Sequence, residues 1–335
     1  MHIRSVREIL EEKEGRRDYL SLRIDKTVPG GLRITKRVCN ENCVFDYATG
    51  AKCHDDIVQN GDGEALSNEE FVGLVGKISK AAGKKVRVHI AGDGEPTLLN
   101  NELVSFIGML KSCDAVHSIK LTTNGTMLCM GGTPMALRMK NAGLDSVNIS
   151  LHSLLPQRFK EVTGIDALGT VLKGIDKAVE SGLIVTLNCV IRPETITELD
   201  SFVTLSAEKG IKVKFFSLLS DDGNVQRRYD ALVDSMMHEL DSISEYSESY
   251  MHPYDGRIFS IGKAVIEVKD SRMNRCPNMG CGYRNACVEG CRYEARLSRI
   301  GMLQPCGVRM DNVIHMKGGS EDKDILYALA SGGKL

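Results

Sequence analysis

The sequence of 335 residues contains no tryptophan, few aromatic residues (5%) and no excess of charge of either sign. Its 43 basic and 44 acidic residues leave a formal net charge of −1, too little positive charge to hold a nucleic-acid backbone or an anionic membrane in general. An anionic ligand must therefore meet a local group of basic residues. No apolar run approaches the roughly 18 residues that span a bilayer. The N-terminal stretch MHIRSVREILEEKEGRR also lacks the apolar core of a secretion signal. We therefore expect a cytoplasmic protein without nucleic-acid or membrane partners.

Cysteine is abundant, with eleven residues in the chain. In a reducing compartment structural disulfides are rare, so grouped cysteines indicate metal binding or redox chemistry. Cys113, Cys129 and Cys189 stand alone among apolar or small residues, which is typical of buried packing. The other cysteines form two groups, namely Cys39, Cys43 and Cys53 near the N-terminus and Cys276, Cys281, Cys287, Cys291 and Cys306 near the C-terminus. A zinc site and an iron–sulfur cluster both take four thiolates, so both remain open for the second group.

Between the two cysteine groups, short β-rich runs alternate with amphipathic stretches. This pattern predicts repeated βα units around a parallel sheet. The predicted strands are 31–35, 86–91, 117–122, 144–151, 183–190 and 211–217. The intervening helices carry start and stop signals, including a capping box at Ser67 and Glu70 and a glycine stop at Gly83. Residues 220–275 change in character and predict a linker and covering helix, and within them 258–270 is strand-like.

Unusual polar strings follow the predicted strands. The first cysteine group follows strand one, AGDGEP follows strand two, TTNG ends strand three and SLHS ends strand four. In a parallel barrel the carboxyl ends of the strands form the active-site face. The sequence therefore predicts an enzyme whose polar residues meet at one edge of the sheet.

With these strings in this order, the chain resembles the radical S-adenosylmethionine superfamily, and within it the MoaA family of GTP 3′,8-cyclases. The resemblance covers residues 31–220 through LRITKRVCNENC, AGDGEPTLLNNEL, IKLTTNGTML, GLDSVNISLHSL and GIDKAVESGLIVTLNCVI, and returns at RLSRIGMLQPC, 296–306. It implies a partial (βα)6 TIM-like barrel over 31–220. It also implies an N-terminal helical extension over 1–30, an auxiliary-cluster domain with its linker over 221–320, and a C-terminal tail with a Gly-Gly pair over 321–335.

The resemblance also implies the cofactors and the residues that hold them. Two [4Fe-4S] clusters and S-adenosylmethionine are expected, with the metal ligands Cys39, Cys43, Cys53, Cys281, Cys287, Cys291 and Cys306. The residues expected around S-adenosylmethionine are Phe45, Gly92, Gly94, Glu95, Pro96, Thr123, Asn124, Ser150 and Asn188. Arg33, Arg292 and Arg296 are expected to act on an anionic substrate such as GTP. An electron donor such as flavodoxin or ferredoxin, and a homodimer, follow from the same analogy.

The chain departs from the family pattern at several positions. The third cysteine of the first motif is replaced by Asp46, so either Cys53 or Asp46 is the third ligand. Three cations that hold the nucleotide in the family correspond to Asn101, Thr186 and Glu294. Cys276 is left as a spare thiol. These departures keep two alternatives open: a radical enzyme for a different substrate, such as a peptide, a sugar or another nucleotide, and a non-catalytic zinc-binding relic.

Overall fold

The computed structural model of the protein describes residues 19–25, 39–41, 43–44, 65–92, 94–218, 223–250, 256–270, 294–305 and 312–331, and the structural statements below concern these residues. The strands are β1 (Leu20–Asp25), β2 (Val86–Ala91), β3 (Val116–Thr123), β4 (Ser146–Ser150), β5 (Ile184–Val190), β6 (Lys212–Phe216), β7 (Tyr246–Tyr250), β8 (Gly256–Ile261), β9 (Ala264–Lys269), β10 (Glu294–Leu297), β11 (Met302–Gln304) and β12 (Ile314–His315). The helices are α3 (Asn68–Ala82), α4 (Asn101–Lys111), α5 (Met135–Ala142), α6 (Pro156–Thr163), α7 (Leu168–Glu180), α8 (Pro193–Thr197), α9 (Leu199–Lys209), α10 (Gly223–Ile243) and α11 (Asp322–Ser331), with the 3-10 turns η3 (Pro96–Leu99) and η5 (Met316–Gly318).

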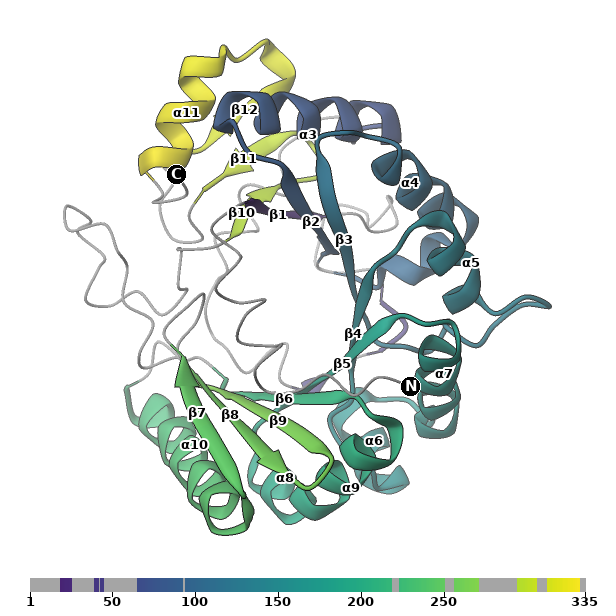
Figure 1. Ribbon diagram of the computed structural model, residues 1–335, viewed down its shortest axis with the longest axis vertical. Helices are drawn as coiled ribbons and strands as arrows, with labels where there is room; N and C mark the ends of the chain where they lie inside the picture. Colours follow the sequence, from purple (N-terminus) through teal and green to yellow (C-terminus); the bar gives the residue numbers. More distant parts are fainter. Residues whose placement is uncertain are drawn as a thin grey trace.

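The described strands form one twelve-stranded sheet in the order β12-β11-β10-β1-β2-β3-β4-β5-β6-β9-β8-β7. The run from β10 to β9 is parallel, and an antiparallel pair closes each edge. The sheet curves into an open barrel, with α3 to α9 on its outer face (Figure 1). This confirms the predicted α/β fold with a partial TIM-like barrel.

The strands that carry the polar strings lie close to their predicted positions, and β2 coincides with the predicted 86–91. The first strand differs. It was expected at 31–35, which lies outside the described residues, whereas the strand that pairs with β2 is β1 at Leu20–Asp25. This strand falls within the segment 1–30 that the resemblance assigned to a helical extension. The predicted strand over 258–270 is a hairpin, in which Gly262 at φ 55° turns β8 into β9.

The hydrophobic core lies between the sheet and the outer helices. Phe71 of α3 meets Phe106 of α4 edge to face, with ring centroids 5.7 Å apart. On the other side of the molecule Phe202 of α9 meets Phe215 of β6 at 5.4 Å. Each fully buried phenylalanine contributes about 1.5–3 kcal/mol through the removal of apolar surface from water. The helices are therefore fixed on the sheet, which in turn fixes the loops at the strand ends.

Helix α3 begins and ends where its sequence signals predict. The Ser67 hydroxyl accepts a hydrogen bond from the Glu70 amide at 3.2 Å, and the Glu70 carboxylate accepts one from the Ser67 amide at 2.7 Å. Gly83 ends the helix at φ 63°, in the left-handed region that glycine adopts without a Cβ penalty. The predicted capping box is confirmed.

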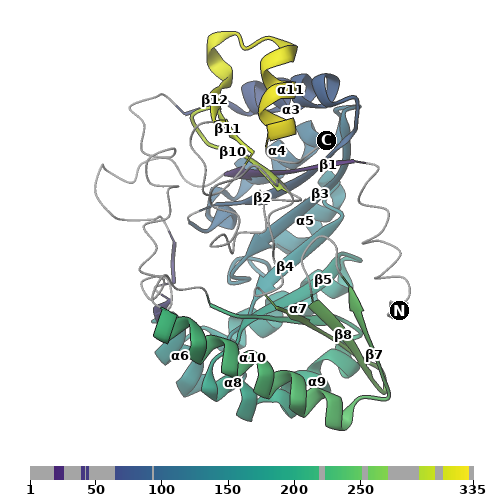
Figure 2. The same cartoon turned by 90° about the vertical axis from the view of Figure 1, so that its left-hand side faces the viewer.

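Two further helices cover the sheet. The predicted covering helix is α10, whose Val233, Met236 and Leu240 belong to the main core. The C-terminal helix α11 lies beside α3, and Asp322 forms an ion pair of 3.5 Å with Lys80 (Figure 2). Within the described ranges, none of the helices is both long and apolar enough to cross a bilayer.

Candidate active site

Glu95 is the centre of a buried hydrogen-bond network that joins two strands at their carboxyl ends. Its Oε1 accepts hydrogen bonds from the Thr97 amide at 3.0 Å, the Thr97 hydroxyl and the Thr123 hydroxyl at 2.5 Å. Its Oε2 accepts one from the Asn124 amide at 2.7 Å. Glu95 is also the N-cap of η3, with Pro96 at the first position of that turn. The GDGEP string after β2 and the TTNG string at the end of β3 are therefore held together by one carboxylate.

The electrostatics of Glu95 reflect two opposing effects. Burial of the side chain, which is 3% exposed, raises its pKa, while the four hydrogen bonds act in the opposite direction. All four of these donors are neutral groups, so none of the four hydrogen bonds pairs the carboxylate with a cation. Its geometry is thus fixed by directional bonds.

Asn124 connects this network to the first cysteine group. Its Nδ2 donates to Asn40 Oδ1 at 2.7 Å and lies 3.9 Å from Cys39 Sγ. Its Oδ1 accepts from the Thr126 hydroxyl at 2.8 Å, and that hydroxyl in turn accepts from Asn40 Nδ2 at 2.8 Å. The closed set of amides and hydroxyls places Cys39 beside the end of β3.

The turn after β3 depends on glycine at position 125. Gly125 has φ 82°, and a Cβ there would lie 2.7 Å from Ile149 Cγ2. Helix α7 approaches from outside, so close that a Cβ on Gly174 would lie 2.5 Å from the Gly125 carbonyl oxygen. The turn that carries Asn124 is therefore clamped between β4 and α7.

Cys39 and Cys43 both lie close to Glu41. Cys39 is exposed and its Sγ accepts a contact of 3.4 Å from the Glu41 amide. Cys43 is buried, with its Sγ 3.6 Å from Glu41 Oε2. The backbone and amide N–H groups directed at Cys39 Sγ stabilise its thiolate form, which is the form that binds iron. Within the described ranges no group of three or more metal-ligand side chains occurs, and the third predicted ligand, Cys53, lies outside them.

The ends of β4 and β5 carry the other predicted side chains. Ser150 and Asn188 are register partners, and the Leu151 amide donates to the Asn188 carbonyl at 2.9 Å. Among the residues that the structure describes, none forms a hydrogen bond with the buried Asn188 Oδ1. An unsatisfied buried amide oxygen costs free energy, so this atom fits a site that receives a donor from a ligand.

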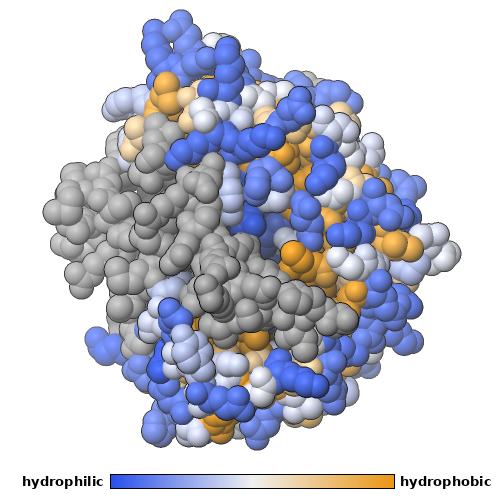
Figure 3. Space-filling view, viewed as in Figure 1, coloured by the Kyte–Doolittle hydropathy of each residue, from blue (hydrophilic) through white to orange (hydrophobic). Residues whose placement is uncertain are grey.

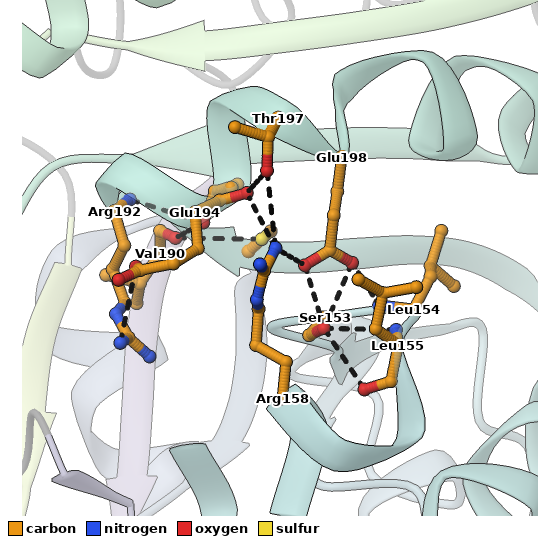
Figure 4. A network of polar contacts seen from close by, with 11 residues as sticks. Ser153, Leu154, Leu155, Arg158, Val190, Arg192, Glu194, Thr197 and Glu198 are labelled. Atoms are coloured by element: carbon orange, nitrogen blue, oxygen red, sulfur yellow. Dashed lines mark hydrogen bonds and ion pairs between the residues drawn. The ribbon is translucent and has the colours of Figure 1, made fainter. Parts of the chain in front are cut away.

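A second buried carboxylate braces the same end of β4 and β5 (Figure 4). Glu198, at the start of α9, accepts hydrogen bonds from Ser153 Oγ at 2.9 Å, from the Leu154 amide at 2.6 Å and from Arg158 Nη1 at 2.9 Å. The Val190 amide donates to Nδ1 of the buried His152 at 3.3 Å. Burial, with the nearby positive charge of Arg192, lowers the pKa of His152 to about 3. The loop after Ser150 is therefore tied to β5 and α9.

The face of the sheet opposite the helices, which we call the inner face, is polar and rich in cations. Alternation along each strand puts residues such as Val88 and Ile90 in the outer core and places their neighbours on the inner face. The charged residues placed there are Arg23, Arg87, Lys120, Lys212, Lys214, Lys269 and Arg296, with Glu267 and Glu294 as the anions. Figure 3 shows hydrophilic residues near the centre of this view, with hydrophobic residues beside them. This face suits a ligand with negative charge.

His89 lies on the inner face and was missed in the sequence. Its Nδ1 lies 2.8 Å from Glu294 Oε1 and its Nε2 lies 2.8 Å from Thr122 Oγ1. Burial lowers the pKa of His89 to about 4, against the opposing effect of Glu294. Burial alone would raise the pKa of Glu294, but His89, Arg23 and Lys120 hold it below its usual range. The alternation Val86, Val88, Ile90 was the signal that could have placed His89 on this face.

The structure also locates Asn101 and Thr186, two positions that the resemblance aligned with nucleotide-binding cations. Asn101 begins α4, and its Oδ1 accepts a hydrogen bond from Arg138 Nη1. Thr186 lies on the inner face of β5 beside Lys212 of β6, whose Nζ pairs with Glu267 at 2.5 Å. Cations remain on the inner face, but on neighbouring strands.

The structure thus brings Cys39, Glu95, Thr123 and Asn124 together and places Ser150 and Asn188 on the next two strands. Gly92, Gly94 and Pro96 lie in the loop after β2, Cys43 lies near Cys39, and Arg296 lies on the inner face of β10 as the register partner of Arg23. The predicted residues outside the described part of the chain are Arg33, Phe45, Cys53, Cys281, Cys287, Arg292, Cys291 and Cys306, together with Asp46 and Cys276.

The sequence is similar to known proteins over most of its length. The family model of the radical SAM superfamily matches residues 34–205. A "Probable GTP 3′,8-cyclase" of Sulfurisphaera tokodaii is 31% identical over 291 residues, which is 84% of this chain and 82% of the relative. A protein of the same name from Saccharolobus solfataricus is 31% identical over 292 residues, 84% of each chain.

Solved structures share the fold at low identity. Native anSMEcpe with bound AdoMet superimposes with a TM-score of 0.61 and 15% identity, covering 94% of this chain and 82% of that one. Streptococcus suis SuiB bound to S-adenosylmethionine gives a TM-score of 0.58 at 13% identity, covering 96% and 72%.

Proposed function

Because the chain belongs to the radical SAM superfamily and, within it, to the MoaA family of GTP 3′,8-cyclase relatives, we propose that it catalyses a GTP 3′,8-cyclase-like step of molybdopterin biosynthesis. The observation that carries this proposal is the placement of Glu95, Asn124 and Asn188 at the carboxyl ends of β2, β3 and β5, with Cys39 beside Asn124.

The donor set fits the cofactors of the superfamily. Thiolates suit iron–sulfur clusters, and Cys39 already receives N–H contacts at its sulfur. We assign Cys39, Cys43 and Cys53 to the first [4Fe-4S] cluster, and Cys281, Cys287, Cys291 and Cys306 to a second. When bound, the first cluster supplies the electron that cleaves S-adenosylmethionine to a 5′-deoxyadenosyl radical, which abstracts hydrogen from the substrate.

The residues at the strand ends bind and orient S-adenosylmethionine in this proposal. Glu95 holds the backbone of Gly94 and Pro96 in the shape that receives the methionine amino group. Asn188 offers its free Oδ1 to a donor of the cofactor, and Ser150, its register partner, offers a hydroxyl to the carboxylate. Glu198 and His152 keep the Ser150 loop from moving away from β5. Each of these groups binds or positions; none changes its protonation.

The inner face supports an anionic substrate. Arg23, Lys120, Lys214 and Arg296 lie on it, and a triphosphate is bound by such groups through charge-assisted hydrogen bonds. We place Arg33 and Arg292 in the same role, with a flavodoxin or ferredoxin as the electron donor and a homodimer as the assembly. The auxiliary cluster then belongs to the segment 221–320, and the Gly-Gly tail to 321–335.

A second candidate keeps the radical chemistry but takes a different substrate. Glu294 places a negative charge on the inner face, where a phosphate would be repelled. A substrate without phosphate, such as a peptide or a sugar, would then occupy the site.

Anaerobic reconstitution with iron and sulfide tests the cofactor assignment. About eight iron atoms per chain support two [4Fe-4S] clusters and about four support one, whereas tight zinc without iron indicates a binding protein and refutes the proposal. We expect Cys53→Ala to abolish formation of 5′-deoxyadenosine and Asp46→Ala to preserve it. The reverse result would reassign the third ligand to Asp46.

A further inference from the structure

Thr122, His89 and Glu294 form a continuous line of hydrogen bonds on the inner face of the sheet. Thr122 lies on β3, His89 on the adjacent β2, and Glu294 on β10, one strand beyond β1. The two contacts of His89 are both 2.8 Å long. Three strands thus contribute a hydroxyl, an imidazole and a carboxylate in series.

The chemistry of the three groups fixes the direction of the hydrogen bonds. Glu294 is held ionised by the hydrogen bond from His89 and by the positive charges of Arg23 and Lys120, so its oxygen can only accept. His89 Nδ1 therefore carries the proton. A neutral imidazole then has its lone pair on Nε2, which accepts the hydroxyl proton of Thr122.

This leaves the oxygen of Thr122 as the open end of the line. Thr122 is partly exposed on the inner face, and it precedes Asn124 by one strand repeat, about 6–7 Å. The cofactor residues assigned above lie at the strand ends, so Thr122 lies one layer deeper. A substrate on the inner face below S-adenosylmethionine would contact it.

We propose that Thr122, His89 and Glu294 are a proton relay that accepts a proton from a hydroxyl of the substrate, and this inference rests on the proposed function. The substrate O–H bond breaks and its proton moves to Thr122 Oγ1, while the Thr122 proton moves to His89 Nε2. The substrate oxygen keeps the bonding electron pair. The imidazolium is stabilised by Glu294, and the reverse transfer returns the proton to the product.

The cations around the relay favour the loss of a proton from the substrate hydroxyl. Lys120 lies on the same face of β3 as Thr122, two residues earlier, and Arg23 and Arg296 are register partners on β1 and β10. These cations stabilise a negative oxygen, and they disfavour a lasting positive charge on His89. A hydroxyl on a carbon that has lost a hydrogen atom is much more acidic than an ordinary alcohol, so transient transfer to a weak base suffices.

Kinetics of four variants test the relay, and the fourth is His89→Asn. Thr122→Val removes the hydroxyl at almost constant volume, Thr122→Ser restores it, and Thr204→Val on the exposed face of α9 is the matched control. We expect Thr122→Val and His89→Asn to lower cyclised-product formation on the order of 100-fold, the usual contribution of a general base. The variants should still bind GTP and form 5′-deoxyadenosine as the control does, although little cyclised product appears. Their thermal midpoints should also stay near that of the control. Thr122→Ser should recover most of the product.

The relay would be overturned if Thr122→Val formed as much product as Thr204→Val. It would also be overturned if the loss of product were matched by an equal loss of GTP binding or of thermal stability. A second measurement does not depend on the substrate. In protein labelled with ¹⁵N-histidine, His89 should show a protonated Nδ1 and an unprotonated Nε2 at pH 7, and the other tautomer refutes the inference. If the wild-type enzyme cleaves S-adenosylmethionine but leaves GTP unchanged, the proposed substrate fails, and this spectrum decides the relay separately.

Discussion

Replacement of Glu95 by glutamine tests the network that joins the GDGEP and TTNG strings. The carboxylate accepts four hydrogen bonds, three at Oε1 and one at Oε2. If the glutamine oxygen takes the Oε1 position, its NH2 group faces the Asn124 amide, so two donors meet and that amide loses its acceptor.

The magnitude follows from these bonds. Losing the charge on the acceptor weakens each of the three remaining bonds by about 1 kcal/mol, and leaving the buried Asn124 amide unsatisfied costs about 1–3 kcal/mol. The burial that raises the pKa of Glu95 opposes this loss, because glutamine carries no charge to desolvate. We therefore expect Glu95→Gln to lower the free energy of unfolding by about 2–4 kcal/mol.

Urea denaturation followed by far-UV circular dichroism measures this change, which suits a chain without tryptophan. Glu208→Gln, on an exposed position of α9, is the control and should change the free energy by less than about 0.5 kcal/mol. A Glu95→Gln protein as stable as the control would refute the account of Glu95 as the link between β2 and β3.

Three further predictions concern the ends of β4 and β5. Asn188→Ala should leave the free energy of unfolding almost unchanged, because Oδ1 has no partner among the described residues. It should weaken S-adenosylmethionine binding about tenfold, a loss of about 1.4 kcal/mol that equilibrium dialysis measures. A destabilised variant with normal binding would contradict this. Glu198→Ala should lower the free energy of unfolding, measured by urea denaturation, by about 3–5 kcal/mol, because Ser153, the Leu154 amide and Arg158 lose a buried partner. Glu198→Gln should lower it by less. The pKa of His152 is about 3 in the folded state, against 6.5 ordinarily, so the unfolded chain takes up a proton first and stability falls as the pH drops from 6.5 towards 3. His152→Gln should flatten that decline in a series of denaturation curves, and an unchanged slope would show that His152 is not buried in its neutral form.

Local patterns predicted most of the barrel. Strand β2 was placed correctly because Val86, Val88 and Ile90 alternate with polar residues, and α3 because Ser67 and Glu70 form a capping box. These features depend on neighbours in the sequence. The first strand could not be placed so well, because LSLRID at 20–25 is short and follows a charged stretch, and its partners β2 and β10 are distant in the chain.

The same limit applies to the site. GDGEP and TTNG could be recognised as strings, and their position after strands placed Glu95 and Asn124 at one edge. The hydrogen bonds of Glu198 to Ser153 and of His89 to Glu294 join residues 45 and 205 positions apart. Such pairs depend on the register of the folded sheet, so no spacing in the sequence indicates them.

The most direct test of the central claim is the transfer of deuterium from GTP labelled at carbon 3′ of its ribose into 5′-deoxyadenosine. The anaerobically reconstituted protein is incubated with S-adenosylmethionine, a reductant and the labelled nucleotide, and the 5′-deoxyadenosine is analysed by mass spectrometry. The account predicts 5′-deoxyadenosine that carries deuterium and a cyclised nucleotide that has lost it. Unlabelled 5′-deoxyadenosine would contradict GTP as the substrate, and its absence would contradict radical chemistry in this protein altogether.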